Sequence, residues 1–468
     1  MDQHIVQSTQ TYYTPRAGLC ALGALLTRRG FFDPLARQVH IPQKVRQHTP
    51  LDKLTDAFIG ILSGVSGLYL VDKTVRPDVA LQRAFGRQSC AEQATIHDTL
   101  YAAEAENVLQ LRAAWRDLFR QYSRASQHDY QQTPLVIDLD LSGERTGRRA
   151  AQASTGYFVG QRGAYGRQHG RALAAAYDEV IVERLYVGNI HLAAVMRHLL
   201  EDVENVLPLT PHQHSRVIVR MDAAGGRVDD IAWLLARGYH VHLKLYSWHH
   251  AAALAQSVRV WRTSPLHPKR QVGLVHRPYA FGYPTTQIAV RTVKTSGHVS
   301  YHVIVSSVPP EDVVALVGRS PQAAWDADAL ILAYADLYDD RSGPIEHSFG
   351  EGHQALPLTK RHRRAWVAQE IALLLVGLAH NTLVWLREWL AEGWAACRDL
   401  GLLRLVRDVL TVPGYVTLDA TGRLLAIHFN ALDPCASSFV QAWQPLLRPH
   451  AIDVGLAPLS IVIKELLL

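Results

Sequence analysis

The residues best suited to chemistry in this chain are carboxylates at the ends of apolar segments. Residues 134–142 (PLVIDLDLS) alternate apolar and polar side chains, which predicts a β-strand with Asp138 and Asp140 on one face. Two carboxylates side by side on a half-buried strand repel each other and lose hydration, which is costly unless positive charge lies beside them. A divalent cation would supply that charge. The alternative is that these aspartates only cap the strand end and the turn after it.

Two further carboxylates have a similar setting. Asp222 follows the apolar segment 217–221, and open α/β sheets bind ligands at the carboxyl ends of such strands. In the run 338–346 (YDDRSGPIE), Pro344 suits the first position of a helix, so Glu346 would lie in the first turn. His353 would then lie two turns further along the same face. The alternative for Glu346 is an acidic residue that only interacts favourably with the start of the helix.

The elements around these residues predict an α/β fold with a partly parallel sheet. Residues 215–222 and 239–246 are predicted strands, and the predicted helix between them, 228–237, ends at Gly238. A strand–helix–strand unit of this kind makes its two strands parallel. Residues 287–295 and 298–305 predict a hairpin that follows a basic loop at 265–270. Residues 325–407 are predicted to be mainly helical, with a small hairpin around 419–422.

The N-terminal region, residues 1–130, is predicted to be mostly helical. Residues 51–68 and about 91–121 carry apolar side chains at helical spacing. A glycine-containing turn at 86–89 precedes the polar residues 92–95, an order typical of a helix-turn-helix that presents base-reading side chains. An ordinary helical hairpin fits the same pattern, so DNA binding by this region is one of two interpretations.

Composition limits the function classes. A chain of 468 residues with 48% apolar residues can bury a large core in two to four units, and 19% charged residues leave little for a long disordered tail. A formal charge of +6 favours a polyanionic partner, although many enzymes carry as much. The four cysteines are far apart and form no C-x-x-C pair, which disfavours a disulfide framework and a structural zinc site. Among the 24 histidines no His-x-x-x-His has a partner carboxylate on a clear helix, which also disfavours zinc.

No targeting or membrane segment is expected. The N-terminus lacks the basic start and apolar core of a signal peptide, and the apolar run 371–379 is too short to span a bilayer. We therefore expect a cytoplasmic protein that associates with the nucleoid when it binds DNA, with no membrane partner.

Three blocks in this order resemble the DD-E transposases of bacterial insertion sequences, in the group with a tyrosine, arginine, glutamate and lysine signature. Residues 138–143 (DLDLSG) are similar to the family's D-x-D-x-T-G strand, and residues 220–226 (RMDAAGG) to its R-x-D-x-G block. The run 338–346, with residues 358–361 and 378–385 after it, is similar to the segment that carries the catalytic glutamate. The resemblance covers about residues 50–395 and departs from the signature at two points. One extra residue separates Arg341 from Glu346, and His353 stands where the signature has lysine.

The resemblance implies a ribonuclease-H-like mixed sheet flanked by helices, in which Asp140, Asp222 and Glu346 are catalytic and bind two Mg²⁺ (or Mn²⁺) ions. Asp138 would support the site or pair with an arginine. The resemblance also implies that Tyr338, Arg341, His353 and Trp261 contact DNA. Two basic clusters flank the proposed carboxylates and are expected to contact DNA as well: Arg148 and Arg149 after Asp140, and Lys360 and Arg361 after Glu346. A solvated charged face is the alternative for the two basic clusters.

The expected domains are a helical DNA-binding region (1–130), the first part of the catalytic domain (131–249), a β-rich insertion (250–310), the remainder of the catalytic domain (311–400) and a C-terminal region (401–468). The insertion would grip the DNA end, with Trp248 or Trp261 stacking on an extruded base, or would be a structural flap. Expected partners are duplex DNA at terminal inverted repeats and target sites, and a second copy of the chain in a synaptic dimer. The alternatives are a catalytically inactive transposase-derived DNA-binding protein and a metal-dependent nuclease unrelated to transposition.

Overall fold

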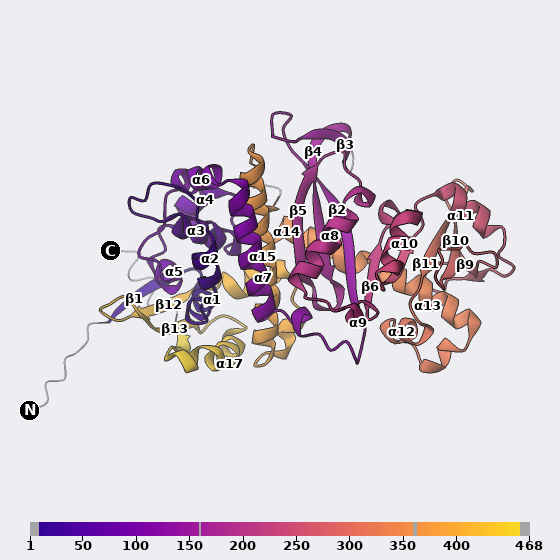
Figure 1. The fold of residues 1–468 in the computed structure, drawn as a ribbon. Coiled ribbons are helices and arrows are strands. Elements are labelled where there is room, and N and C mark those ends of the chain that lie inside the picture. The colour runs from indigo at the N-terminus through magenta and orange to yellow at the C-terminus, as the bar shows by residue number, and fades with distance from the viewer. Residues whose placement is uncertain (1–8, 159–160, 359–362, 459–468) are drawn as a thin grey trace, which may run out of the picture. The chain divides into compact units, whose positions relative to one another are not determined.

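The strands that bear or precede the three aspartates lie in the middle of a large mixed sheet (Figure 1). The computed structural model describes residues 9–158, 161–358 and 363–458. They form two units, which we call the carboxylate unit (Ser123–Arg148 and Gln152–Phe349) and the terminal unit (Met1–Tyr122, Arg149–Ala151 and Gly350–Leu468). The chain is therefore a mixed α/β protein, as expected.

The carboxylate unit contains ten strands among its described residues, with β5 paired to β4 and the others in the order β3-β4-β2-β6-β7-β11-β10-β9-β8. Their bounds are β2 Leu135–Arg145, β3 Ser154–Phe158, β4 Gln161–Ala174, β5 Glu179–Val187, β6 Val217–Met221, β7 His240–Lys244, β8 Arg262–Thr263, β9 Arg270–Leu274, β10 Thr286–Val293 and β11 Val299–Ser306. The helices are α8 Leu192–Val206, α9 Pro211–His214, α10 Val228–Ala236, α11 Trp248–Ala255, α12 Pro310–Leu316, α13 Ala327–Asp340 and α14 Ser342–Gln354, which continues into the terminal unit.

Two predicted supersecondary units are confirmed. Strands β6 and β7 are parallel, joined by α10, and β2 also pairs with β6 in parallel. Strands β10 and β11 form the predicted antiparallel hairpin, with Gly297 at φ 78° in its turn. This hairpin belongs to the same sheet as the aspartate strands, because β11 pairs antiparallel with β7. The pairing satisfies backbone groups that an open β7 edge would leave to solvent.

Alternation along β2 decides which side chains meet the helices. Val136 belongs to an apolar core that β6, β9, β10 and β11 form with α12 and α13, so one face of the sheet is covered by those two helices. Asp138 and Asp140 share that face with Val136, because they follow it at intervals of two. The aspartates therefore point toward the side of the sheet on which α13 lies.

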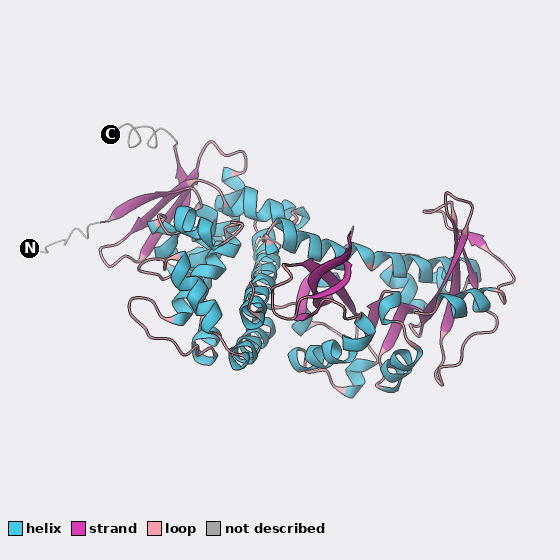
Figure 2. Ribbon diagram, turned by 90° about the horizontal axis from the view of Figure 1, so that it is seen from above, coloured by secondary structure: helices cyan, strands magenta, loops and turns pink. Residues whose placement is uncertain are grey.

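The terminal unit combines helices with a small sheet in the order β1-β12-β13-β14, drawn in magenta close to the termini in Figure 2. The strands are β1 Gln10–Thr14, β12 Gly414–Leu418, β13 Leu424–Asn430 and β14 Asp453–Ala457. Strands β12 and β13 form the hairpin predicted around residues 419–422. The pairing of β1 with β12 joins an N-terminal segment to a C-terminal one, and the prediction of a mostly helical N-terminal region did not include this strand.

The terminal unit's helices are α1 Ala17–Arg28, α2 Asp33–Gln38, α3 Pro50–Leu62, α4 Leu68–Leu70, α5 Val79–Ala84, α6 Gln93–Ala102, α7 Ala105–Tyr122, α15 Trp366–Ala391, α16 Leu402–Arg404 and α17 Ala436–Leu447. The single helix predicted over about 91–121 is wrong, because it consists of α6 and α7. Ala103 adopts an extended backbone, and the Asn107 side chain accepts a hydrogen bond from the Glu104 amide at 2.9 Å, which starts a new helix.

Helix α15 is longer than the apolar run seen in the sequence. Its 26 residues are long and apolar enough to cross a membrane by length and composition alone. In the protein, 89% of its most apolar stretch is buried, as in the core helix of a globular unit. Membrane crossing therefore has no support beyond length and composition.

Glu144 on β2 should make the stability of the protein depend on pH. Burial raises the pKa of Glu144 from its ordinary 4.5 to about 7, while the neighbouring Arg167 acts in the opposite direction. Since the folded-state pKa lies above the unfolded one, this stabilisation is complete below about pH 4.5 and is lost as the pH rises through about 7. We expect the free energy of unfolding of Glu144→Gln to equal that of the wild type at acidic pH and to exceed it by about 1–3 kcal/mol above pH 7. Urea denaturation across this range measures the difference, and parallel pH curves for the two proteins would contradict the prediction.

Candidate active site

The candidate site lies where the pairing between β2 and β6 ends. These parallel strands pair from Leu135 with Val217 to Asp138 with Arg220. Asp140 lies two residues beyond the last pair, and Asp222 directly follows β6. The two carboxylates therefore lie at the same end of the β2–β6 pair, with Asp140 still within β2 and Asp222 just after β6. They are close enough for the charge of Asp222 to raise the pKa of Asp140.

Asp138 forms a buried ion pair with Arg220, which confirms the prediction that it pairs with an arginine. The Arg220 Nε and Nη2 groups donate to the two carboxylate oxygens at 2.7 and 2.9 Å. Arg220 Nη1 donates to the Leu337 carbonyl and to Asp340 Oδ2, both at 2.9 Å. Because Asp138 and Arg220 are almost completely buried, this pair joins β2, β6 and the end of α13 without exposing a charge.

Asp140 is half-buried and lies beside Arg341. Burial raises the pKa of Asp140 to about 6, and the Arg341 guanidinium opposes that rise with Nη1 donating to Asp140 Oδ2 at 3.2 Å. The charges of Asp140, Asp138 and Asp222 also stabilise the protonated guanidinium of Arg341. In this structure Arg341 thus supplies part of the positive charge that the paired carboxylates need.

The metal-binding prediction can be compared with the donors that the structure brings together. Asp140 and Asp222 offer carboxylate oxygens, the ligands that Mg²⁺ prefers, at one partly accessible edge. Glu346 lies in α14 with an exposed side chain. Within the described ranges, no group of three or more His, Cys, Asp and Glu side chains is arranged to hold a metal ion. The structure therefore gathers two of the three carboxylates, and ligation by Glu346 stays a prediction.

Helix α14 is anchored to the sheet two residues after Glu346. Ser348 accepts a hydrogen bond from Arg171 Nη1 at 2.9 Å, and the Arg171 guanidinium lies 4.6 Å from the ring centroid of Phe349. Arg171 also donates to Glu183 through Nε at 2.8 Å, and Glu183 contacts His169. Since Arg171 is the cross-strand partner of Asp140, one side chain connects the position of Asp140 with the helix of Glu346. Helix α14 begins at Ser342, so Pro344 lies inside the first turn and not at its first position.

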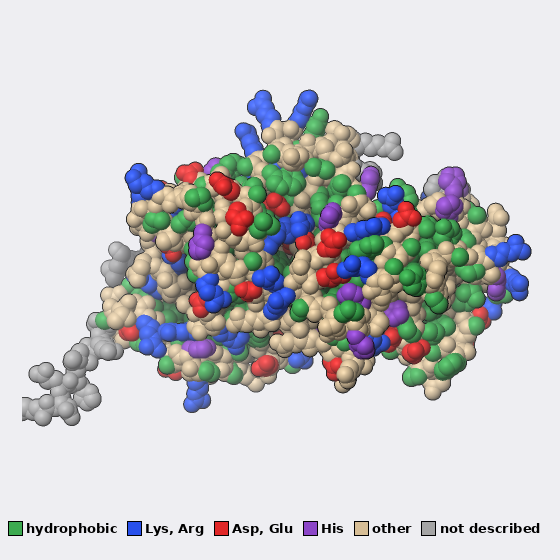
Figure 3. Space-filling model, in the orientation of Figure 1, with side chains coloured by type: hydrophobic (Ala, Val, Ile, Leu, Met, Phe, Trp, Pro, Cys, Tyr) green, Lys and Arg blue, Asp and Glu red, His purple; other side chains and the backbone are tan. Residues whose placement is uncertain are grey.

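Burial corrects part of the predicted DNA-binding surface. Arg167 and Arg171 belong to the arginine-rich segment after Asp140, but each side chain is about 1% exposed and cannot contact a phosphate. The strand register turns both inward, opposite Glu144 and Asp140. Arg148 and Arg149 are exposed, in keeping with their predicted role, and basic side chains project from the region of the β2–β4 strands in Figure 3.

The other predicted DNA contacts have varied settings. Tyr338 is buried, and burial raises its pKa to about 12. Trp261 is half-buried, with the Arg291 guanidinium 4.3 Å from its ring centroid. His353 lies in α14, which extends as far as the sequence comparison requires. Lys360 and Arg361 lie outside the described residues, as does the side chain of Trp248.

Sequence reasoning missed Lys244, the last residue of β7. Its ammonium nitrogen lies 4.4 Å from the ring centroid of Tyr338. Burial lowers the pKa of Lys244, and Arg270 and Arg341 lower it further, while Asp339 and Asp222 oppose them. Lys244 ends β7, which is parallel to β6, so it lies at the same end of the sheet as Asp222. That position at the carboxyl end of a parallel strand is the signal that could have identified it.

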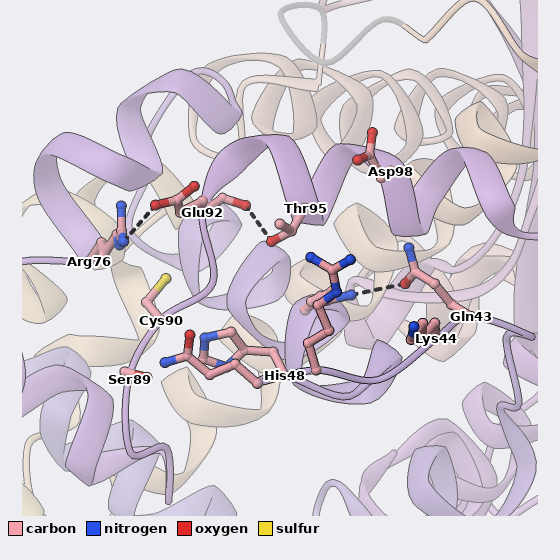
Figure 4. A pocket seen from close by; sticks show the side chains of 12 residues that line it. Gln43, Lys44, His48, Arg76, Ser89, Cys90, Glu92, Thr95 and Asp98 are labelled. Atoms are coloured by element: carbon pink, nitrogen blue, oxygen red, sulfur yellow. Dashed lines mark hydrogen bonds and ion pairs between the residues drawn. The ribbon is translucent and has the colours of Figure 1, made fainter.

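The predicted helix-turn-helix region contains a pocket of about 700 Å³ near the start of α6. Figure 4 shows Arg76 paired with Glu92 on one side of it, and the two side chains are 2.9 Å apart. Lys44 and His48 approach from the loop before α3, and Asp98 from α6 (Figure 4). The charged side chains of the lining are mainly basic, with Lys44, Arg46, Lys53 and Arg76 against Glu92 and Asp98. A basic lining fits a DNA-reading motif, but it does not by itself distinguish one from an ordinary helical hairpin.

No family model and no curated protein matches this chain. Among solved structures, it is similar to the chain in the cryo-EM structure of a piggyBac transposase synaptic complex with hairpin DNA. That similarity has a TM-score of 0.43 and 12% sequence identity, and it covers 85% of this chain and 80% of the other. At this TM-score the similarity supports no conclusion, so the fold described above rests on the strand pairing alone.

Replacing Arg171 should loosen α14. Arg171→Met leaves the carboxylate of Glu183 buried without its guanidinium partner, and loss of one member of a buried pair costs about 3–5 kcal/mol. We expect lower stability and faster hydrogen exchange at the α14 amides that follow Ser348. Arg197→Met removes a pair in which the arginine is exposed although Asp230 is buried, and it should cost less, about 1–3 kcal/mol, with unchanged exchange in α14. Equal exchange rates in the two variants would show that Arg171 does not anchor the helix.

Proposed function

We propose that this chain is a DD-E transposase that cleaves DNA strands at the ends of an insertion sequence and joins them to target DNA. The observation that supports this most strongly is the proximity of Asp140 and Asp222 at the end of the β2–β6 pairing, with Arg341 close enough to interact with both and Tyr338 nearby. These four residues come from all three sequence blocks that resemble the family. Blocks that match independently and then meet in space are hard to explain without a common site.

We infer that the strands β5-β4-β2-β6-β7 are the ribonuclease-H-like core. Three of them, β5, β4 and β2, are antiparallel neighbours, and β2, β6 and β7 are parallel neighbours. Helix α8 packs on this sheet, and α10 connects its last two strands. In the proposal, the strands β8–β11 are the insertion that grips the DNA end.

The chemistry that we propose needs few protein groups. Two Mg²⁺ (or Mn²⁺) ions, when bound, activate water or a 3′-hydroxyl and stabilise the leaving oxygen. Asp140, Asp222 and Glu346 would hold them. Arg220 would keep Asp138 neutralised and the first two ligands in position. The guanidinium of Arg341, which donates to Asp140 in this structure, would contact a DNA phosphate in the complex, and its place beside the carboxylates suits that role.

The partners that we propose are duplex DNA at terminal inverted repeats and target sites, with two copies of the chain in the synaptic complex. Arg148 and Arg149 supply exposed positive charge for the DNA backbone. Such phosphate contacts fix register and orientation but read no sequence.

A catalytically inactive descendant that only binds DNA is the second candidate. It is favoured by His353, which replaces the signature lysine and is only partly charged near neutral pH. The two candidates differ in one property, metal-dependent strand cleavage.

Cleavage of DNA that carries the segments flanking the gene tests the proposal. We expect nicking with Mg²⁺ or Mn²⁺, abolished by Asp140→Asn, Asp222→Asn or Glu346→Gln because each removes an ion ligand. Asp138→Asn should leave partial cleavage, since Asp138 acts only through Arg220. Asp328→Asn, on the exposed part of α13, is the matched control and should cleave normally. Wild-type protein that binds these segments and never nicks them would favour the inactive descendant. Equal losses from Asp138→Asn and Asp140→Asn would contradict the assignment of Asp140.

Trp261 tests the role of the insertion. If its ring stacks on an extruded base, Trp261→Ala should reduce end cleavage by about tenfold or more while the protein stays folded, because base–aromatic stacking contributes about 1–3 kcal/mol. Trp261→Phe retains a stacking surface and should recover part of the activity. End binding and cleavage at wild-type levels in Trp261→Ala would assign the tryptophan to packing with Arg291 and Tyr301.

A further inference from the structure

A second group of charged side chains lies on the sheet face that bears the carboxylates. Lys244 pairs in register with Ile304 of β11, and His302 is two residues before Ile304 on the same face. His302 is opposite Val290, Val290 is opposite Val272, and Arg270 is two residues before Val272. The strand register therefore places Lys244, His302 and Arg270 on one face.

These side chains show an excess of positive charge. Burial lowers the pKa of His302 to about 4, and repulsion from Lys244 and Arg270 contributes to that shift. Arg270 Nη2 donates to Asp339 Oδ1 at 2.8 Å, so one carboxylate partly balances this group. The positive charges of Arg270 and Lys244 are thus opposed, among the described residues outside the candidate active site, by the carboxylate of Asp339.

Two features indicate that an anion completes this group. First, a pocket of about 520 Å³ opens here, and Lys269, Arg270, Thr292 and His302 line it. Second, within the described part of the chain the Nε atom of Arg270 is buried and donates no hydrogen bond. A buried donor without an acceptor is costly, and an anionic oxygen would satisfy it.

We propose that Lys244, Lys269 and Arg270 form a phosphate subsite that holds a backbone phosphodiester of the DNA strand beside the scissile bond. This inference rests on the proposed function, because it assumes that a DNA strand reaches the carboxylates. Lys244 connects the two sites, since it interacts with both Asp222 and Arg270. A strand that crosses Asp140 and Asp222 toward β11 meets Lys244 and then Arg270. The subsite positions the strand and reads no base.

The salt dependence of DNA binding tests the subsite. The probe is a duplex that carries a flanking segment of the gene and a single-stranded extension, measured with Ca²⁺ in place of Mg²⁺. Each lost phosphate contact should reduce the slope of log affinity against log salt by about 1. We expect this change for Arg270→Gln, Lys244→Gln and Lys269→Gln, with affinity weakened by roughly tenfold or more. Lys269 is exposed, so its substitution should leave the protein folded and keeps the test valid if a variant at a buried residue fails to fold.

Two controls separate charge from structure. Lys244→Arg keeps the positive charge and should keep the wild-type slope. Arg237→Gln removes an exposed charge between α10 and β7, at the opposite end of β7 from Lys244, and should also leave the slope unchanged. Unchanged slopes in Arg270→Gln and Lys269→Gln, with folded proteins, would overturn the proposal.

Further measurements distinguish free phosphate from a DNA phosphate as the bound anion, and distinguish failure of the subsite from failure of the proposed function. Inorganic phosphate that protects wild type but not Arg270→Gln against thermal unfolding, with normal DNA slopes in the variants, would assign the pocket to a free anion and overturn the subsite. Wild-type protein that cleaves DNA while the slopes stay equal would leave the proposed function standing without the subsite. Altered slopes without wild-type cleavage would support the subsite in a DNA-binding protein that lacks the chemistry. Failure of the wild type to bind the probe at all would overturn both.

Discussion

Arg220 has almost no contact with solvent, yet it carries a full positive charge between two carboxylates and a backbone carbonyl. A buried cation in such a position is tolerable only when its partners are held in good geometry. Those partners come from β2 and from the end of α13, while Arg220 itself comes from β6. Correct pairing of the two strands and correct docking of the helix are therefore conditions for one interaction. Asp140, Asp222 and Arg341 each lie within a few residues of this ion pair.

The charges around the candidate site form two groups, one buried and one partly accessible. In the buried group the charge is balanced within the protein, since Asp138 and Asp340 neutralise Arg220. In the second group the negative charge is only partly balanced, since Asp140 and Asp222 share the single positive charge of Arg341. Burial still raises the pKa of Asp140. Carboxylates whose charge is only partly balanced attract cations, and the neighbouring Lys244 and Arg270 attract anions. A substrate with phosphates that binds together with metal ions matches both.

Continuity of the sheet is what brings these two groups together. Because β11 pairs with β7, the strands after β7 continue the surface on which the carboxylates lie. Because side chains alternate between the two faces of a sheet, the residues of β6, β7, β11, β10 and β9 that lie in register with Asp138 of β2 point to the same face as Asp138. Arg171 performs a comparable task on the other side of β2, where it connects the strand position of Asp140 with the helix of Glu346.

The sequence by itself determined the local elements. Alternation in residues 134–142 places Asp138 and Asp140 together, and a short helix between two apolar strands makes β6 and β7 parallel, because these patterns depend only on neighbouring residues. Only the tertiary structure decided that Arg220 pairs with Asp138, that Arg171 is buried, that β1 pairs with β12 and that Lys244 is near enough for its charge to interact with that of Asp222. Those contacts join positions far apart in the chain. Whether a charged side chain there faces water or a buried partner depends on packing that no local pattern encodes.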